Sequence, residues 1–152
     1  MISLPLEREA IFPRIDGIQK NIRKLRELGV LPFEEFRAGD AYDLAQHHLR
    51  LALEGVFHIG AHILSRLPGE RATEYREIAI KLGEGGIVKR KFAEDVLVPM
   101  ARMRNLLVHH YADVDAQRLY AVIRDHLSDI EEFLLVVKEL CEHPEKHGLE
   151  LV

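Results

Sequence analysis

The chain has 152 residues, a net charge of −4 and 47% hydrophobic residues, so it is long enough to form one domain with its own core. No apolar run approaches the ~20 residues that span a membrane, and the first residues lack the basic stretch of a secretory signal. The single Cys141 excludes an intrachain disulfide. We therefore expect one cytoplasmic domain over residues 1–152, with no membrane partner.

Two long helices are predicted in the first half of the chain. Isoleucines at steps of four and three mark the first, over roughly residues 6–28. Its start is expected between Ser3 and Pro13, because proline is tolerated only in the first turn of a helix. Residues 29–39 contain Pro32 and Gly39 and are expected to form a loop. The second helix covers residues 40–67, with Asp40 as its predicted N-cap.

Three further helices are predicted in the second half. The first is short, covers residues 73–84 and has Thr73 as its predicted cap. The next runs over residues 87–109 and should bend at Pro99, which cannot donate a backbone hydrogen bond. The last covers residues 115–141, and the tail beyond it is expected to be loose.

No segment of useful length alternates polar and apolar residues with a period of two, and no repeat or linker interrupts the pattern. Five helices joined by short loops indicate an all-α fold, an up-down helical bundle.

Basic residues gather between Gly86 and Tyr111, where five of them accompany two acids and give a local charge of +3. Most charge runs are the solvated face of a helix, and that interpretation stays open here. The same segment contains Arg104–Tyr111, which combines an arginine, an amide, two imidazoles and a phenol within eight residues.

Within this stretch Asn105 and His109 are four residues apart and share one helix face. Arg104 lies about 140° around an ideal helix from His109, so the two side chains converge only where the helix ends at His109. One arginine and one histidine at a helix end make a poor cleft, whereas two copies related by a two-fold axis place two pairs face to face. The geometry favours a homodimer with its site at the interface.

As a pattern the segment is Arg-x4-His-x-Tyr within PMARMRNLLVHHYADVD. It resembles the signature of the HEPN superfamily, and more closely its HepT-like branch, the ribonuclease toxins of HEPN/minimal-nucleotidyltransferase (HepT–MntA type) modules. The order of the predicted helices agrees with that branch over roughly residues 5–142. The resemblance implies a homodimeric five-helix HEPN bundle and a toxin of a type VII-like toxin–antitoxin system.

The resemblance also implies an endoribonuclease that needs neither metal nor other cofactor, with Arg104 and His109 catalytic and Asn105 supporting them. Such an enzyme cleaves its RNA substrate by attack of the 2′-hydroxyl on the adjacent phosphodiester. Histidine titrates near neutral pH and moves the proton, and arginine holds the charge that develops on the phosphoryl oxygens.

In the same branch, the tyrosine of the motif accepts AMP groups from the partner nucleotidyltransferase, and this modification silences the nuclease. The resemblance therefore implies AMPylation of Tyr111 by a cognate minimal nucleotidyltransferase antitoxin. This chain lacks the Gly-Ser…Asp-x-Asp pattern of such an enzyme, so the modification requires a second protein. The other interpretation is that the Tyr111 ring packs on the bundle with its hydroxyl in water.

Other interpretations remain open. Arginine and histidine near a helix C-terminus complement the helix dipole without any catalytic role. In that case the chain is a non-catalytic helical module that docks a nucleotidyltransferase partner. Glu54, His58 and His62 step by four and have the spacing of metal ligands, but no His-Glu-x-x-His pattern is present, and we expect partly buried or interface histidines with no metal site.

Overall fold

The computed structural model describes residues 4–69 and 71–152, and throughout these residues the regular elements are helical, apart from one isolated β-bridge between Leu6 and Leu151. The predicted all-α fold is thereby confirmed. The helices are α1 (Arg8–Gly29), α2 (Phe33–Ala38), α3 (Ala41–Ser65), α4 (Tyr75–Glu84), α5 (Arg90–Phe92), α6 (Val98–His109), α7 (Ala116–Asp125) and α8 (Leu127–Glu142). A π-helical turn, Ala93–Leu97, joins α5 to α6, and short 3₁₀ turns follow α6 and α8.

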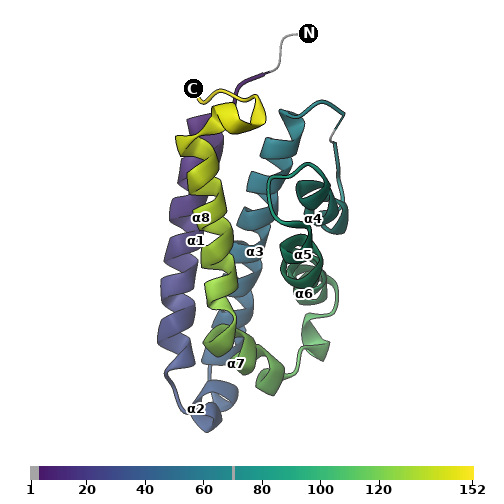
Figure 1. The fold of residues 1–152 in the computed structure, drawn as a ribbon. Coiled ribbons are helices and arrows are strands. Elements are labelled where there is room, and N and C mark those ends of the chain that lie inside the picture. Colours follow the sequence, from purple (N-terminus) through teal and green to yellow (C-terminus); the bar gives the residue numbers. More distant parts are fainter. Residues whose placement is uncertain (1–3, 70) are drawn as a thin grey trace.

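The long helix α3 is the centre of the bundle. It packs against α1 along its length, and it also contacts α4, α6, α7 and α8. In Figure 1, α1, α3 and α8 stand upright, whereas α4 and the α5–α6 segment are seen nearly end-on beside α3. None of the helices in the described part of the chain is long and apolar enough to cross a membrane.

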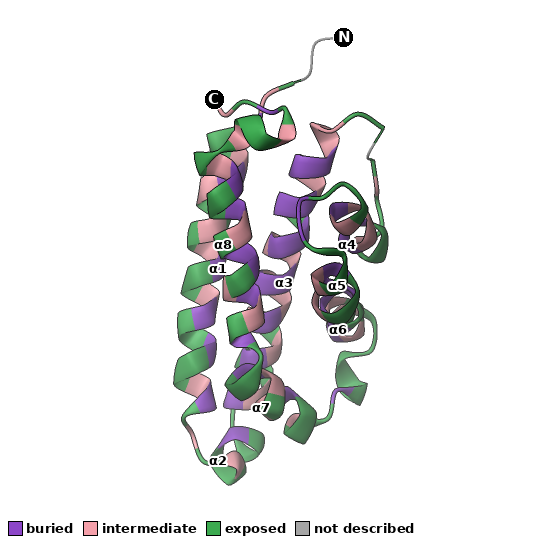
Figure 2. Ribbon diagram, viewed as in Figure 1, coloured by how far each residue is buried: buried purple, intermediate pink, exposed green. Residues whose placement is uncertain are grey.

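Because α3 has neighbours on two sides, it buries two stripes of side chains, as its colouring in Figure 2 indicates. The predicted stripe from Ala45 to Ile63 is buried, and a second stripe that includes Phe57 and Leu64 joins it. At Gly60 the helices approach closely, since a Cβ there would lie 2.9 Å from a side-chain carbon of Ile78 on α4. The missing side chain lets α4 pack directly on α3.

The prediction of a loop over residues 29–39 is wrong, because this segment contains the six-residue helix α2. The Phe36 side chain is fully buried, and the centroid of its ring lies 5.0 Å from the ring centroid of Tyr120 on α7. This aromatic packing stabilises a helix too short to be stable in isolation.

The helix caps and the position of Pro13 differ in part from those predicted from the sequence. Asp40 and Thr73 make no capping hydrogen bond, and α4 begins only at Tyr75. Asp115 does cap α7, where its carboxylate accepts a hydrogen bond from the Gln117 amide at 2.8 Å. Pro13 lies inside α1, beyond its first turn.

The helix predicted over residues 87–109 begins at Arg90 and changes its hydrogen bonding near Pro99. The Val98 amide donates to the Ala93 carbonyl, five residues back, which makes the turn π-helical. Pro99 has no N–H to offer the Asp95 carbonyl, so the ladder is broken there and the backbone rearranges around the gap.

The single helix predicted over residues 115–141 is instead two helices, because the backbone leaves the helical region at His126. The segment α7 packs on α1, α2 and α3. The helix α8 follows it and is joined to α1 by an ion pair between Glu131 and Arg26. The predicted loose tail is also wrong: Leu149 is buried, and backbone hydrogen bonds join residues 150–152 to residues 6–8. The two ends of the chain are thus paired.

Candidate functional site

The Arg-x4-His-x-Tyr segment lies at the C-terminal end of α6. The helix ends at His109, which is the condition under which Arg104 and His109 can turn toward a common region. His110 has φ −140° and ψ 40°, and Tyr111 opens a 3₁₀ turn. The Gln46 side-chain amide of α3 donates to the Tyr111 carbonyl at 3.0 Å and ties this turn to the central helix.

Arg104 is held by three neighbouring side chains. Its Nε and Nη2 donate to Oε2 of Glu54 on α3 at 3.2 and 2.9 Å. Its Nη1 donates to Oδ1 of Asn105 at 3.2 Å. Its guanidinium carbon lies 4.4 Å from the ring centroid of Tyr75 on α4, a cation–π distance. The guanidinium is therefore fixed in position by three helices.

The glutamate that holds Arg104 is shared with a second arginine. Arg50, one turn earlier on α3, donates from Nη1 to Glu54 Oε1 at 2.8 Å, so each carboxylate oxygen serves one arginine. The Glu54 side chain is 17% exposed and that of Arg104 is 22% exposed. Two cations around one carboxylate leave this half-buried group with a positive charge that suits an anion.

Tyr75 is itself locked in place. Its ring stacks on the ring of Phe57 at 4.8 Å with an interplanar angle of 17°, and Phe57 is fully buried. Its hydroxyl lies 3.2 Å from Nε2 of His58. Burial raises the pKa of Tyr75, so the hydroxyl stays protonated.

His109 and Asn105 are exposed, and within the described residues no hydrogen bond or ion pair joins His109 to Arg104. The two predicted catalytic residues are thus on one helix end but are not in direct contact in a single chain. Of the five basic residues in the motif region, only Arg104 is turned inward. The other four are exposed: Lys89, Arg90, Lys91 and Arg102.

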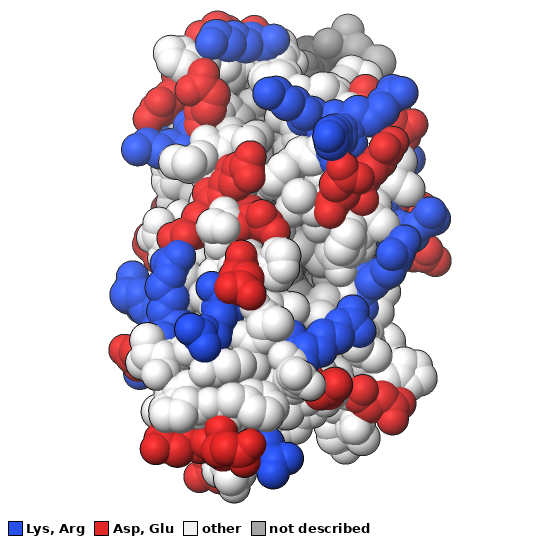
Figure 3. Space-filling view, turned by 60° about the horizontal axis from the view of Figure 1, so that its bottom comes forward, with Lys and Arg blue, Asp and Glu red and all other residues white. Residues whose placement is uncertain are grey.

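Figure 3 shows basic and acidic side chains interspersed over the face it displays, as expected for a chain with a net charge of −4. Because four of the five basic residues of the predicted segment are exposed, the solvated-face interpretation describes most of that segment.

All four tyrosines of the chain are described, and Tyr111 differs from the other three. The residue is 64% exposed. The hydroxyls of the others bind neighbouring groups: Tyr42 donates to the Val114 carbonyl, Tyr75 contacts His58, and Tyr120 donates to the Leu31 carbonyl at 2.6 Å. Tyr111 is therefore the most exposed of the four tyrosines, and its hydroxyl has no hydrogen-bond partner among the described residues.

Glu54, His58 and His62 are not among the side chains whose ligand atoms converge in the described part of the chain. Glu54 binds two arginines and His58 contacts Tyr75. The Nε2 atom of His62 accepts a hydrogen bond from the backbone N–H of Glu7 at 3.1 Å. Each side chain thus has a different partner.

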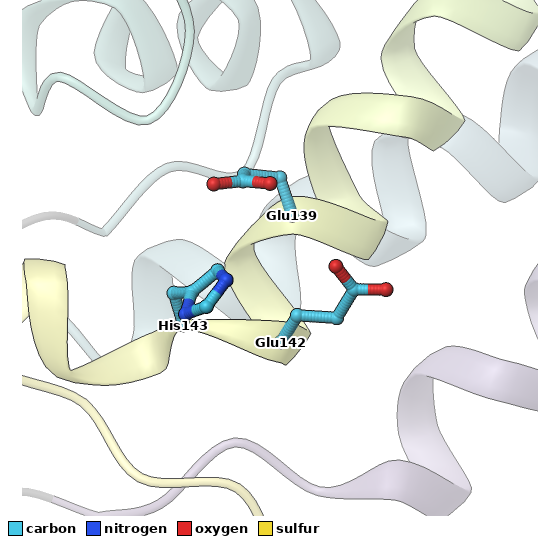
Figure 4. A group of neighbouring side chains, drawn as sticks. All are labelled: Glu139, Glu142 and His143. Carbon is cyan, nitrogen blue, oxygen red and sulfur yellow. The ribbon is translucent and has the colours of Figure 1, made fainter.

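Within residues 4–69 and 71–152, one group of metal-type side chains does converge, at the end of α8 (Figure 4). It consists of Glu139, Glu142 and His143, whose ligand atoms lie within 4.8 Å of one another. All three are exposed, and the Glu139 carboxylate already pairs with Lys146 at 3.4 Å. Exposed acidic groups of this kind are ordinary surface features, and this one has no contact with the motif.

The His62 contact leads to a prediction about pH. Burial, followed by the charge of Arg66, lowers the pKa of His62 below its ordinary value of about 6.5, and protonation removes the lone pair that accepts from Glu7. Below pH 6.5 the unfolded chain takes up this proton more readily than the folded chain, so stability falls as the pH falls. We expect a lower melting temperature at pH 5.5 than at pH 7.5.

His62→Gln should reduce this dependence, because the Gln side chain also accepts from the Glu7 amide but does not titrate in this range. The control is His126→Gln, at the exposed junction of α7 and α8. Equal pH dependence of the melting temperature in both variants and the wild type would contradict the role of His62.

A comparison with known protein families places the site in context. Residues 18–137 match the family model described as "Ribonuclease HepT-like", which covers most of the chain. The chain belongs to the ribonuclease HepT-like family. Membership in this family confirms the resemblance found at Arg104–Tyr111 and the predicted enzyme class, a ribonuclease.

Individual HepT-like relatives are distant in sequence but similar in fold. A tRNA nuclease HepT from Aphanizomenon flos-aquae is 24% identical over 136 residues, which cover 89% of this chain and 90% of the relative. A tri-AMPylated HEPN toxin of Shewanella oneidensis, solved in complex with an MNT antitoxin, has a TM-score of 0.79 at 21% identity, covering 87% of this chain and 98% of that one. The cytosolic protein of unknown function YutE from Bacillus subtilis has a TM-score of 0.74 at 15% identity, covering 97% and 99%. These structural likenesses show the HepT-like fold.

The sequence does not indicate the observed role of two residues of this HepT-like site, Glu54 and Tyr75. The spacing of Glu54 suggests only a metal ligand, and no pattern in the sequence places Tyr75 in the site. The i,i+4 spacing of Arg50 and Glu54 signals an ion pair on α3, but nothing in the sequence signals the contact of either helix with Arg104.

Proposed function

We propose that this chain is a metal-independent endoribonuclease toxin in which Arg104 and His109 are catalytic and Asn105 is a supporting residue. The observation that supports it is the fixed, half-buried guanidinium of Arg104 at the end of α6, with an exposed imidazole just beyond it, in a ribonuclease HepT-like chain. A fixed guanidinium binds a phosphodiester through two parallel donors and keeps its charge at every relevant pH.

The reaction follows from the chemistry of these two groups. His109 removes the proton of the 2′-hydroxyl, the 2′-oxygen attacks the adjacent phosphorus, and the bond to the 5′-oxygen breaks. Arg104 stabilises the negative charge that grows on the phosphoryl oxygens. The products are a 2′,3′-cyclic phosphate and a 5′-hydroxyl, once the leaving oxygen has taken up a proton.

The need for both a base and an acid supports a homodimer. A single chain presents one exposed motif histidine at the helix end and no contact between that histidine and Arg104 within the described residues. Two chains related by a two-fold axis supply two histidines and two arginines to one interface, so one imidazole can accept a proton while the other donates one.

We further propose that Tyr111 is AMPylated by a cognate minimal nucleotidyltransferase and that this modification silences cleavage. The exposure of the Tyr111 side chain supports it, and so does the description of the Shewanella oneidensis relative as tri-AMPylated and bound to an MNT antitoxin. An AMP group there adds bulk and a negative phosphate close to where substrate phosphate binds.

Incubation of the purified chain with total RNA, with and without a metal chelator, tests the proposed activity. We expect cleavage at equal rates in both conditions and products that end in a cyclic phosphate. Cleavage that the chelator abolishes would contradict a metal-independent mechanism. Absence of cleavage in both conditions would favour the non-catalytic docking module.

A further inference from the structure

The surroundings of Arg104 assign a role to two residues outside the motif. Glu54 binds the Nε and Nη2 edge of the guanidinium through one carboxylate oxygen. This leaves Nη1 facing away from Glu54, toward the exposed Asn105. The Nη1 group of Arg104 is therefore directed to the side of α6 on which Asn105 and His109 lie.

The carboxylate is arranged to orient Arg104 without cancelling its charge. Glu54 divides its two oxygens between Arg50 and Arg104, so one negative charge serves two guanidinium groups. The Glu54 side chain is only 17% exposed, and its interactions are correspondingly less screened than those of a surface pair. A phosphate arriving at Arg104 still meets a net positive group.

Tyr75 restricts the same guanidinium from a different helix. The ring that lies 4.4 Å from the Arg104 guanidinium carbon is stacked on buried Phe57. It is held at its hydroxyl by His58. The fixed ring lies against the guanidinium of Arg104 and limits its movement toward the ring. The hydrogen bonds to the Glu54 oxygen do not restrict that movement.

We infer that Glu54 and Tyr75 are positioning residues of the ribonuclease: they act through Arg104 and hold its guanidinium in the orientation in which it receives the scissile phosphate. The inference rests on the proposed function. The rival role for Glu54 is a lock that competes with phosphate for Arg104, and it predicts the opposite sign, since removing a lock increases cleavage.

The first test is Glu54→Gln, assayed for RNA cleavage at several substrate concentrations. Glutamine keeps an acceptor for Arg104 but loses the charge. We expect kcat to fall about 10–100-fold, with a smaller change in KM, because a misplaced arginine is most costly when charge builds up on the phosphate. The matched control is Glu131→Gln, which removes the carboxylate that binds Arg26 at 2.9 Å between α8 and α1, and it should cleave as fast as the wild type.

The second test uses Tyr75, where no charge is altered. Tyr75→Leu removes the ring and should lower kcat in the same way, whereas Tyr75→Phe keeps the ring and its stack on Phe57 and should restore most of the rate. If Tyr75 has a role only in folding, the cleavage rates of both variants should instead fall in proportion to their loss of melting temperature. This pair decides the inference if Glu54→Gln does not fold.

Arginine-selective ¹H–¹⁵N NMR measures the positioning directly. The Arg104 Nε–H should exchange slowly with solvent in the wild type and faster in Glu54→Gln, while Glu131→Gln should leave it unchanged. Wild-type cleavage rates in Glu54→Gln and Tyr75→Leu, or faster cleavage in Glu54→Gln, would overturn the positioning role. A wild-type protein that does not cleave RNA would overturn the proposed function. The catalytic role of the contact between Glu54 and Arg104 would then fall too, even if NMR shows that the contact forms.

Discussion

Replacing His109 by alanine is expected to reduce RNA cleavage by about 10²–10⁴-fold, the usual contribution of a general base or acid. The fold should be retained, because the His109 side chain is exposed and makes no hydrogen bond with another described side chain. The melting temperature should therefore stay close to that of the wild type, and expression in a bacterial host should no longer be toxic. Initial rates of cleavage, measured on the same RNA at equal protein concentration, check the prediction.

The neighbouring histidine provides a matched control. His110 is also exposed, and its Nδ1 lies 3.9 Å from the Asp113 carboxylate, pointing to a different partner. His110→Ala should cleave RNA at nearly the wild-type rate. If His109→Ala cleaves as fast as His110→Ala, the proton-transfer role of His109 is wrong.

Replacing Tyr111 by phenylalanine is expected to leave the nuclease active but insensitive to its partner. The ring remains, and the hydroxyl it loses makes no hydrogen bond within the described residues, so cleavage should stay within about twofold of the wild type. With the partner nucleotidyltransferase and ATP, the wild type should gain AMP and stop cleaving RNA. Tyr111→Phe should gain none and remain toxic.

Intact-mass and peptide mass spectrometry locate the adduct. The rival acceptors are Tyr42, Tyr75 and Tyr120, whose hydroxyls are all engaged by neighbouring groups. Tyr120→Phe serves as the control and should still be modified and silenced. An adduct on one of these three, or suppression of cleavage without any adduct, would mean that the partner inhibits by another route, such as occlusion of the site.

Much of the fold could be read from local spacing. A helical stripe is a pattern of residues three and four apart, so the positions that become buried on α1 and α3 were visible in the sequence. The helix end at His109 and the effect of Pro99 were also local, since both depend on which backbone groups are free to hydrogen-bond.

The errors arose where distant segments decide the structure. The helix α2 forms because Phe36 is buried against Tyr120, more than eighty residues further along the chain. The tail is ordered because its backbone pairs with residues 6–8. A stripe of apolar residues continues across His126, so the pattern gave no sign that the chain leaves the helix there.

The sequence by itself determined an all-α ribonuclease HepT-like chain whose motif residues end one helix, because that information lies within a few turns of a single segment. Only the tertiary structure decided what surrounds Arg104. Its carboxylate partner, Glu54, is 50 residues away in the chain, and its aromatic partner, Tyr75, belongs to a third helix. Spacing along one helix specifies the face on which a side chain lies, but the groups it meets depend on how the helices pack.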